Sequence, residues 1–112
     1  MNLDSNTFQK GTIYDFNKSV VYADGSIVSK TILKNSAGNI SLFAFDKGQG
    51  LSEHTAPFDA IVQILDGEAE VLINGAPHFL KTGDSIIMPA NIPHALKANV
   101  RFKMQLIMIK GS

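Results

Sequence analysis

His54 and His94 are the two side chains of this sequence best suited to chemistry. His54 lies between two clusters of turn residues, and His94 follows Pro93 where a strand is expected to begin. A neutral imidazole can bind a transition metal, move a proton or accept a hydrogen bond. The third histidine, His78, lies near the end of an expected hairpin, so we expect it to be exposed. The sequence contains no cysteine, which excludes a disulfide framework and thiolate chemistry.

Short β-strands are expected to position these histidines. Turn signals recur about every 8 to 12 residues, which is typical of an all-β sandwich or barrel. Asn74-Gly75 is the strongest hairpin signal, and Asp66-Gly67 predicts a turn between two strands. The expected strands cover residues 20–22, 26–33, 40–45, 51–55, 60–65, 68–73, 77–80, 85–88 and 101–108, and a further strand opens at 93–94.

Two of these stretches have a clear hydrophobic pattern. Residues 40–45 are apolar on both faces of a strand, which predicts burial on both sides. Residues 101–108 alternate instead, with Phe102, Met104 and the two later apolar residues on one face. That alternation predicts a strand with one face turned inward. The methionines are expected to fill gaps in the core.

Length and composition place the chain in a broad class. Its 112 residues, 45% of them hydrophobic, fit a single domain with one core. The formal net charge is zero, which gives no electrostatic footprint for nucleic acid or an anionic membrane. No run approaches the roughly 18 apolar residues of a membrane span, and the first residues do not resemble a signal peptide. We expect a cytoplasmic protein with an N-terminal arm, residues 1–19, and one domain, residues 20–112.

The two histidine-containing stretches resemble the two sequence motifs of the cupin family. The match spans Gly48 to Ala98, and six glycine, proline and histidine anchors stand at the family's spacing, while Asn91 replaces the second motif's glycine and Ala98 its asparagine. These anchors are Gly48, His54, Gly67, Gly83, Pro89 and His94. The resemblance implies a small, RmlC-like jelly-roll barrel, also called a double-stranded β-helix.

The resemblance also implies an incomplete metal site. In cupins, two histidines and a glutamate of the first motif and a histidine of the second hold a divalent metal. The second histidine is replaced here by Ala56 and the glutamate by Ala60. The remaining candidates, His54 and His94, would bind Fe, Mn, Ni or Zn with an incomplete ligand set.

Three nearby polar residues do not restore the ligand set. Glu53 and Asp59 each stand one position away from a cavity-facing residue, so strand alternation points them outward. Gln63 has the same outward parity relative to Ala60. A bulge at Asp59 could re-aim its carboxylate.

Three functions follow from the resemblance. The first is a module that binds a small molecule in a barrel pocket next to a degenerate metal site. The predicted pocket residues are His54, Ala56, Ala60, Val62, Met88, His94 and Met104. The second is a metal-dependent enzyme, dioxygenase-like or isomerase-like, that uses His54 and His94. The third is a structural or regulatory partner. The residues leave open whether the site is catalytic.

The resemblance also implies a homodimer formed through the N-terminal strands. The apolar stretch 40–45 fits a sheet with one face against another subunit.

Overall fold

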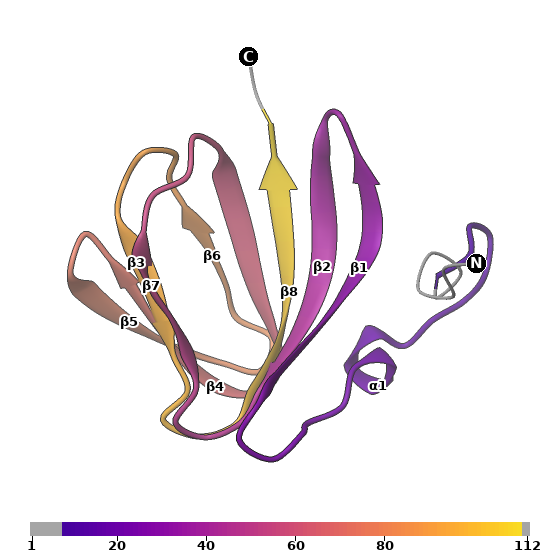
Figure 1. Cartoon of the computed structure of the whole chain (residues 1–112), viewed down its shortest axis with the longest axis horizontal. Helices are drawn as coiled ribbons and strands as arrows, with labels where there is room; N and C mark the ends of the chain where they lie inside the picture. Colours follow the sequence, from indigo (N-terminus) through magenta and orange to yellow (C-terminus); the bar gives the residue numbers. More distant parts are fainter. Residues whose placement is uncertain (1–7, 111–112) are drawn as a thin grey trace.

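The computed structural model describes residues 8–110, which form eight β-strands and one short helix (Figure 1). The elements are α1 (Phe16–Ser19), β1 (Ile27–Asn35), β2 (Gly38–Phe45), β3 (Gly50–His54), β4 (Asp59–Ile73), β5 (Ala76–Lys81), β6 (Ser85–Met88), β7 (His94–Lys97) and β8 (Phe102–Ile109). Every pair of neighbouring strands is antiparallel. The all-β prediction is therefore confirmed. No helix within residues 8–110 is long and apolar enough to cross a bilayer.

The strands form two sheets that share β4. Strands β1, β2, β8, β4 and β6 form the first sheet in that order, and β5, β4, β7 and β3 form the second. The sheets curl around a common interior, with the long strands β4 and β8 near the middle of the molecule (Figure 1). This arrangement is the double-sheet jelly roll that the sequence predicts.

Strand β4 differs from the prediction, because residues 60–65 and 68–73 form one 15-residue strand rather than two. Its first part pairs with β6 and β8, and its second part pairs with β5 and β7. The pairing with β8 shifts register between Ile64 and Asp66, and Gly67 has a φ of +78°. The Asp66-Gly67 turn signal therefore marks a bulge that bends β4 from one sheet into the other.

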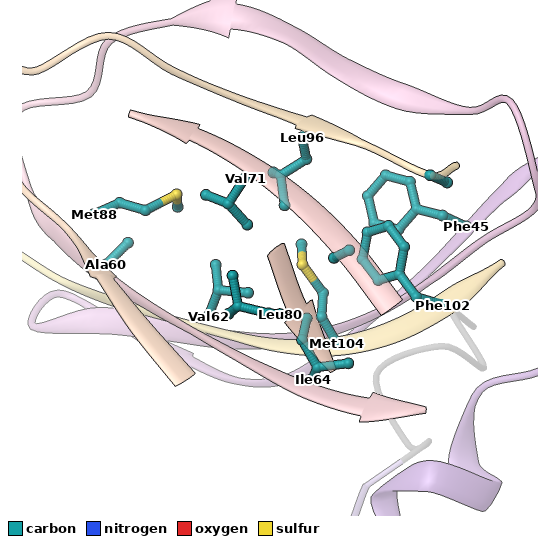
Figure 2. Close-up of a cluster of buried hydrophobic side chains, with 12 residues drawn as sticks. Phe45, Ala60, Val62, Ile64, Val71, Leu80, Met88, Leu96, Phe102 and Met104 are labelled. Atoms are coloured by element: carbon teal, nitrogen blue, oxygen red, sulfur yellow. The ribbon is translucent and has the colours of Figure 1, made fainter. Parts of the chain in front are cut away.

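The interior between the sheets contains the main core. Phe45 on β2 and Phe102 on β8 stack with ring centroids 4.6 Å apart (Figure 2). Phe102 and Met104 are fully buried, which confirms the inward face predicted for residues 101–108. The alternate residues of β2 pack on the opposite face, where Leu42 and Ala44 are also fully buried. Burial of β2 on both faces is thus confirmed.

The chain's own N-terminal segment covers the outer face of β2. Phe8, Phe16, Val20 and Tyr22 pack in one cluster with Leu42 and Ala44. Residues 20–22 form no strand, so that prediction was wrong: Val20 is fully buried in this cluster and lies across the sheet face instead of pairing with an edge. The apolar face that we expected to meet another subunit is therefore already covered. Residues 1–7 of the predicted arm lie outside the described residues.

A polar cluster ties this segment to the barrel. The Tyr22 hydroxyl donates a hydrogen bond to Asp66, and the Arg101 guanidinium lies 4.5 Å from the centroid of the Tyr22 ring. The Lys103 ammonium donates to the carbonyl of Asn17 over 2.6 Å. Burial of Tyr22, followed by its hydrogen bond to Asp66, raises the pKa of its phenol above the ordinary value.

Candidate functional site

Strands β3 and β7 place His54 and His94 side by side. The two residues are cross-strand partners, and their ring centroids lie 4.4 Å apart with the ring planes at 66°. His94 is buried, with 6% of its surface exposed, whereas His54 is exposed. The pair therefore reaches from the barrel interior to solvent.

Backbone carbonyls orient both imidazole rings in the same way. The Nδ1 atom of His54 lies 2.8 Å from the carbonyl oxygen of Ser52, and Nδ1 of His94 lies 3.2 Å from that of Ile92. A carbonyl oxygen only accepts hydrogen bonds, so Nδ1 carries the proton in each neutral ring. The other nitrogen, Nε2, then has a free lone pair. Both rings thus offer Nε2 as a hydrogen-bond acceptor or metal ligand.

A cavity of about 50 Å³ lies beside the two rings. Among the seven predicted pocket residues, His54, Ala56, Ala60, Met88 and His94 line it. Val62 and Met104 do not; both are fully buried in the adjoining core. The structure thus brings five of the seven predicted pocket residues around one cavity.

The cavity has five further apolar lining residues that the predicted pocket lacks. They are Leu51, Phe58, Leu96, Leu106 and Met108. Leu96, Leu106 and Met108 could have been found from strand alternation, since each shares a face with a predicted pocket residue. Leu51 could not, because its distance of three residues from His54 would put it on the opposite face. The register shift between these two residues lets both reach the cavity.

The other polar candidates lie away from the two histidines. Asp59 is exposed, and its carboxylate accepts a hydrogen bond from the backbone NH of Ala90 over 2.9 Å. His78 is exposed on β5, as expected. Glu53 and Gln63 are not among the cavity-lining residues. Within residues 8–110 no three His, Cys, Asp or Glu side chains gather in a way that could hold a metal ion.

Comparison with known proteins agrees with this geometry. The family model of the cupin domain matches residues 41–110, which is more than half of the chain. The chain belongs to the cupin family. A cupin-2 conserved barrel domain protein from Leptotrichia buccalis is 42% identical, with a TM-score of 0.82. The match covers 84% of this chain and 46% of that protein, so this cupin spans about half of that relative's length.

Two other cupin structures match over nearly their whole length. A conserved protein of unknown function from Streptococcus pyogenes is 35% identical over 93% of this chain and 91% of its own, with a TM-score of 0.88. A cupin superfamily protein from Desulfitobacterium hafniense is 25% identical over 94% of this chain and 96% of its own, with a TM-score of 0.87. No curated protein matches this cupin closely enough to count as a relative.

One more distant match is an enzyme. The salicylate 1,2-dioxygenase of Pseudoaminobacter salicylatoxidans is 16% identical over 74% of this chain and 25% of its own, with a TM-score of 0.69. At that identity the likeness is one of fold alone.

The donor set of this cupin does not fit the divalent metal that the fold often carries. His54 and His94 supply two neutral nitrogens, and the cavity lining of the described chain contains no carboxylate. Tight sites for Zn²⁺ have three or four protein ligands, so two neutral nitrogens without a carboxylate hold a buried divalent charge poorly. Ala56 and Ala60 occupy the positions where such ligands stand in the family's motif.

Proposed function

We propose that this cupin is a binding module that holds a small molecule against His54 and His94. The observation that carries the proposal is the pair of imidazoles 4.4 Å apart at the edge of an apolar cavity. Small-molecule sites in proteins commonly combine an apolar lining with a few convergent polar groups. A metal-dependent, dioxygenase-like or isomerase-like enzyme is the second interpretation, and it has less support because the site lacks a third protein ligand.

The orientation of the imidazoles defines the polar group of the ligand. Both free Nε2 atoms accept hydrogen bonds, so the ligand has a hydroxyl or amine hydrogen to donate. Such a donor group suits the pair better than a carboxylate or ketone, which only accepts hydrogen bonds. Leu51, Phe58 and Met108 then contact its apolar part.

The size of the cavity limits how much of the ligand is enclosed. Its volume of about 50 Å³ is well below the roughly 150 Å³ of a protein cavity that holds benzene. An aromatic ring is therefore too large for the closed cavity. Because His54 is exposed, a larger ligand can insert a small group between the histidines and leave the rest in solvent.

A larger hollow elsewhere is a weaker candidate. It has a volume of about 260 Å³ and lies beside Phe79 and Val100, with Glu68 and Lys81 at its edge. It contains no histidine, and its charged residues are exposed. The histidine cavity is smaller, but two imidazole rings held by backbone carbonyls line it.

A thermal-shift screen tests the proposed function. The compounds are small alcohols, phenols and amines, each paired with an analogue whose donor hydrogen is methylated. We expect at least one donor compound to raise the melting temperature by several degrees near saturation, while its methylated analogue does not. His54→Ala and His94→Ala should each abolish the shift, whereas the exposed control His78→Ala should retain it. A screen without a donor-dependent shift, or a shift that survives both cavity substitutions, would contradict the proposal.

We also propose that this cupin forms a homodimer. Within the described residues, β1 pairs with β2 on one side and has no neighbouring strand on the other. Such a free edge is a common site for pairing with another chain. Light scattering at tens of micromolar should give twice the monomer mass of 12.1 kDa; a monomer mass would contradict this.

A further inference from the structure

A row of aliphatic side chains crosses the outer face of the first sheet. Its members are cross-strand partners in turn, so they lie side by side on the strands β1, β2, β8, β4 and β6. Their sequence neighbours on β4, β6 and β8 line the histidine cavity, so alternation points the row away from the barrel interior. Neighbouring strands lie about 4.8 Å apart, which makes the row about 19 Å long. This aliphatic row consists of Leu33, Ile40, Ile107, Ile61 and Ile87.

The N-terminal segment leaves the aliphatic row uncovered. That segment packs on the other half of the same sheet face, against Leu42 and Ala44. Within residues 8–110, no member of the row belongs to either cluster of core side chains. At the two ends of the row, Ile87 is 63% exposed and Leu33 is 45% exposed. A contiguous apolar patch of this kind on a folded protein indicates a surface that binds a partner.

The outer face of the second sheet has the opposite character. Glu68 and Lys81 are cross-strand partners there, and so are Glu70 and Lys97. Pairs of opposite charge on an outward face are typical of a sheet face that stays in water. The aliphatic row contains no charged residue, so its burial against a partner requires no desolvation of an ion. The outer face of the first sheet is therefore the better contact surface.

The shape of the aliphatic row fits a second copy of the same chain. A hollow of about 190 Å³ lies at its β1 end, with Leu33, Ile40 and Ile107 in the lining. This exceeds the roughly 150 Å³ of a cavity that holds benzene, so the hollow has room for an isoleucine side chain. A two-fold axis parallel to the strands reverses the row and places Ile87 of each copy over the hollow of the other. Two-fold interfaces are self-complementary in this sense, because both copies use the same patch.

We propose that the homodimer forms by face-to-face packing of two aliphatic rows, with Ile87 of each copy in the hollow beside Leu33 of the other. The inference rests on the homodimer proposed above and names its contact surface. Backbone pairing along the free β1 edge leaves the row exposed to water, whereas packing of the rows buries it. Sheets packed face to face lie about 10 Å apart. The contact leaves His54 open to solvent in both copies, because β3 belongs to the other sheet.

Light scattering at tens of micromolar tests the contact surface. The wild type should have twice the monomer mass of 12.1 kDa, and Ile87→Lys should have the monomer mass. The lysine would bring a charge into the apolar contact twice per dimer, so the dissociation constant should rise at least about a hundredfold. The matched control Phe79→Lys changes a residue that is 73% exposed on β5 of the second sheet, and it should keep the dimer mass. Both positions are exposed, so both variants should keep the circular dichroism spectrum of the wild type.

Disulfide crosslinking tests the two-fold arrangement. The sequence contains no cysteine, so introduced thiols are the only thiols present. In Leu33→Cys/Ile87→Cys the two thiols of one chain are about 19 Å apart, which is too far for a disulfide, but thiols of different copies are adjacent. Mild oxidation of this double variant should give a covalent dimer on non-reducing electrophoresis. Leu33→Cys and Ile87→Cys alone should each run as a monomer on the same gel.

The possible outcomes separate this inference from the homodimer itself. A wild type of monomer mass would overturn both. A dimer that persists in Ile87→Lys would overturn the inference alone and assign the homodimer to another surface, such as the free β1 edge. Loss of the dimer in Phe79→Lys, or crosslinking of a single cysteine variant as complete as that of the double variant, would also overturn the inference. The thermal-shift screen tests the histidine cavity independently of these measurements.

Discussion

The two ends of the barrel interior are built from the same strands but are filled differently. At the aromatic end, Phe45 and Phe102 stack at 4.6 Å and both are fully buried. At the histidine end, Ala60 and the two imidazoles border a cavity of about 50 Å³. The inward residues of β8 run from Phe102 to Met108, so the two ends lie about 20 Å apart along one strand. Figure 2 shows the ring pair on one side of the core and Met88 with Ala60 on the other.

The difference shows that side-chain size, rather than the backbone, separates the packed core from the cavity in this molecule. Along β8 the same alternation supplies inward residues to both ends. The aromatic end closes because two rings fill its cross-section. The histidine end stays open because alanines stand at two of its inward positions, Ala56 and Ala60. The aromatic end should therefore dominate stability, and the histidine end should dominate binding.

Truncation at the aromatic end should give the largest effect. Phe45→Ala removes a fully buried ring and should lower the free energy of unfolding by about 3–5 kcal/mol. His54→Ala, at the exposed edge of the histidine end, should change it by less than about 0.5 kcal/mol. Urea unfolding of both variants measures the contrast. Equal losses would show that the two ends contribute alike to stability.

The bulge beside the aromatic end should be the next most sensitive position. Gly67 pairs with Phe102, and a Cβ atom there would lie 2.2 Å from the carbonyl oxygen of Arg101. Gly67→Ala should therefore destabilise by at least about 2 kcal/mol through steric overlap and backbone strain. Gly75 has a similar φ of +81° with no atom within 4 Å of a built Cβ, so Gly75→Ala carries only the backbone strain. Chemical denaturation should rank Gly67→Ala below Gly75→Ala in stability; the reverse order would show that the bulge tolerates a side chain.

Filling small positions should separate the cavity from the packed core. Ala98 is 3% exposed, belongs to the core cluster and does not line the cavity, so Ala98→Val should cost about 1–3 kcal/mol by overpacking. Ala60 is 6% exposed but borders the cavity, so Ala60→Val should cost less than about 1 kcal/mol. Ala60→Val should also weaken ligand binding in the thermal-shift screen. A larger stability loss for Ala60→Val than for Ala98→Val would mean that the histidine end is as tightly packed as the core.

The smallest effect is expected outside the aromatic end, where Tyr22 binds Asp66. Loss of this hydrogen bond in Tyr22→Phe should cost roughly 1 kcal/mol at pH 7. The pKa of Tyr22 is raised in the folded chain, so above about pH 10 the unfolded chain loses a proton that the folded chain keeps. This group's contribution to stability is therefore complete below pH 10 and falls as the pH rises further.

Urea unfolding between pH 8 and 11 measures that dependence. The wild type should lose stability more steeply than Tyr22→Phe above pH 10, and the difference between the two isolates Tyr22 from the lysines that titrate in the same range. Parallel curves for the two proteins would contradict a raised pKa for Tyr22.

Much of the barrel could be predicted from the sequence because its signals are local. Glycine and proline anchors at motif spacing give the cupin fold, and alternation gives the inward face of β8 and the burial of β2 on both sides. The same spacing brings His54 and His94 together, since both sit at matching ends of paired strands. Apart from the histidine pair, which joins the two motifs, these features depend on residues within one strand or one motif.

The features that sequence reasoning missed depend on neighbours distant in the chain. Asp66-Gly67 looks like a turn, but both residues pair with β8, and β5 pairs with β4 from Glu68 onward, so the strand stays continuous. Val20 looks like the start of a strand, but the exposed apolar face of β2 binds it instead. Val62 and Met104 have the inward parity of pocket residues, but they lie deeper in the core, beyond the cavity. Alternation gives the face of a strand and says nothing about depth along the barrel.

The most direct test of the account is the protonation of the two cavity histidines. Long-range ¹H–¹⁵N correlation spectra at pH 8, where a free imidazole is neutral, identify which ring nitrogen carries the proton. The Nδ1 contacts predict that both His54 and His94 are protonated at Nδ1 and bare at Nε2, with His54→Ala and His94→Ala used to assign the signals. A proton on Nε2 of either ring would contradict this prediction, because the cavity would then lack the two lone pairs that the proposed ligand needs.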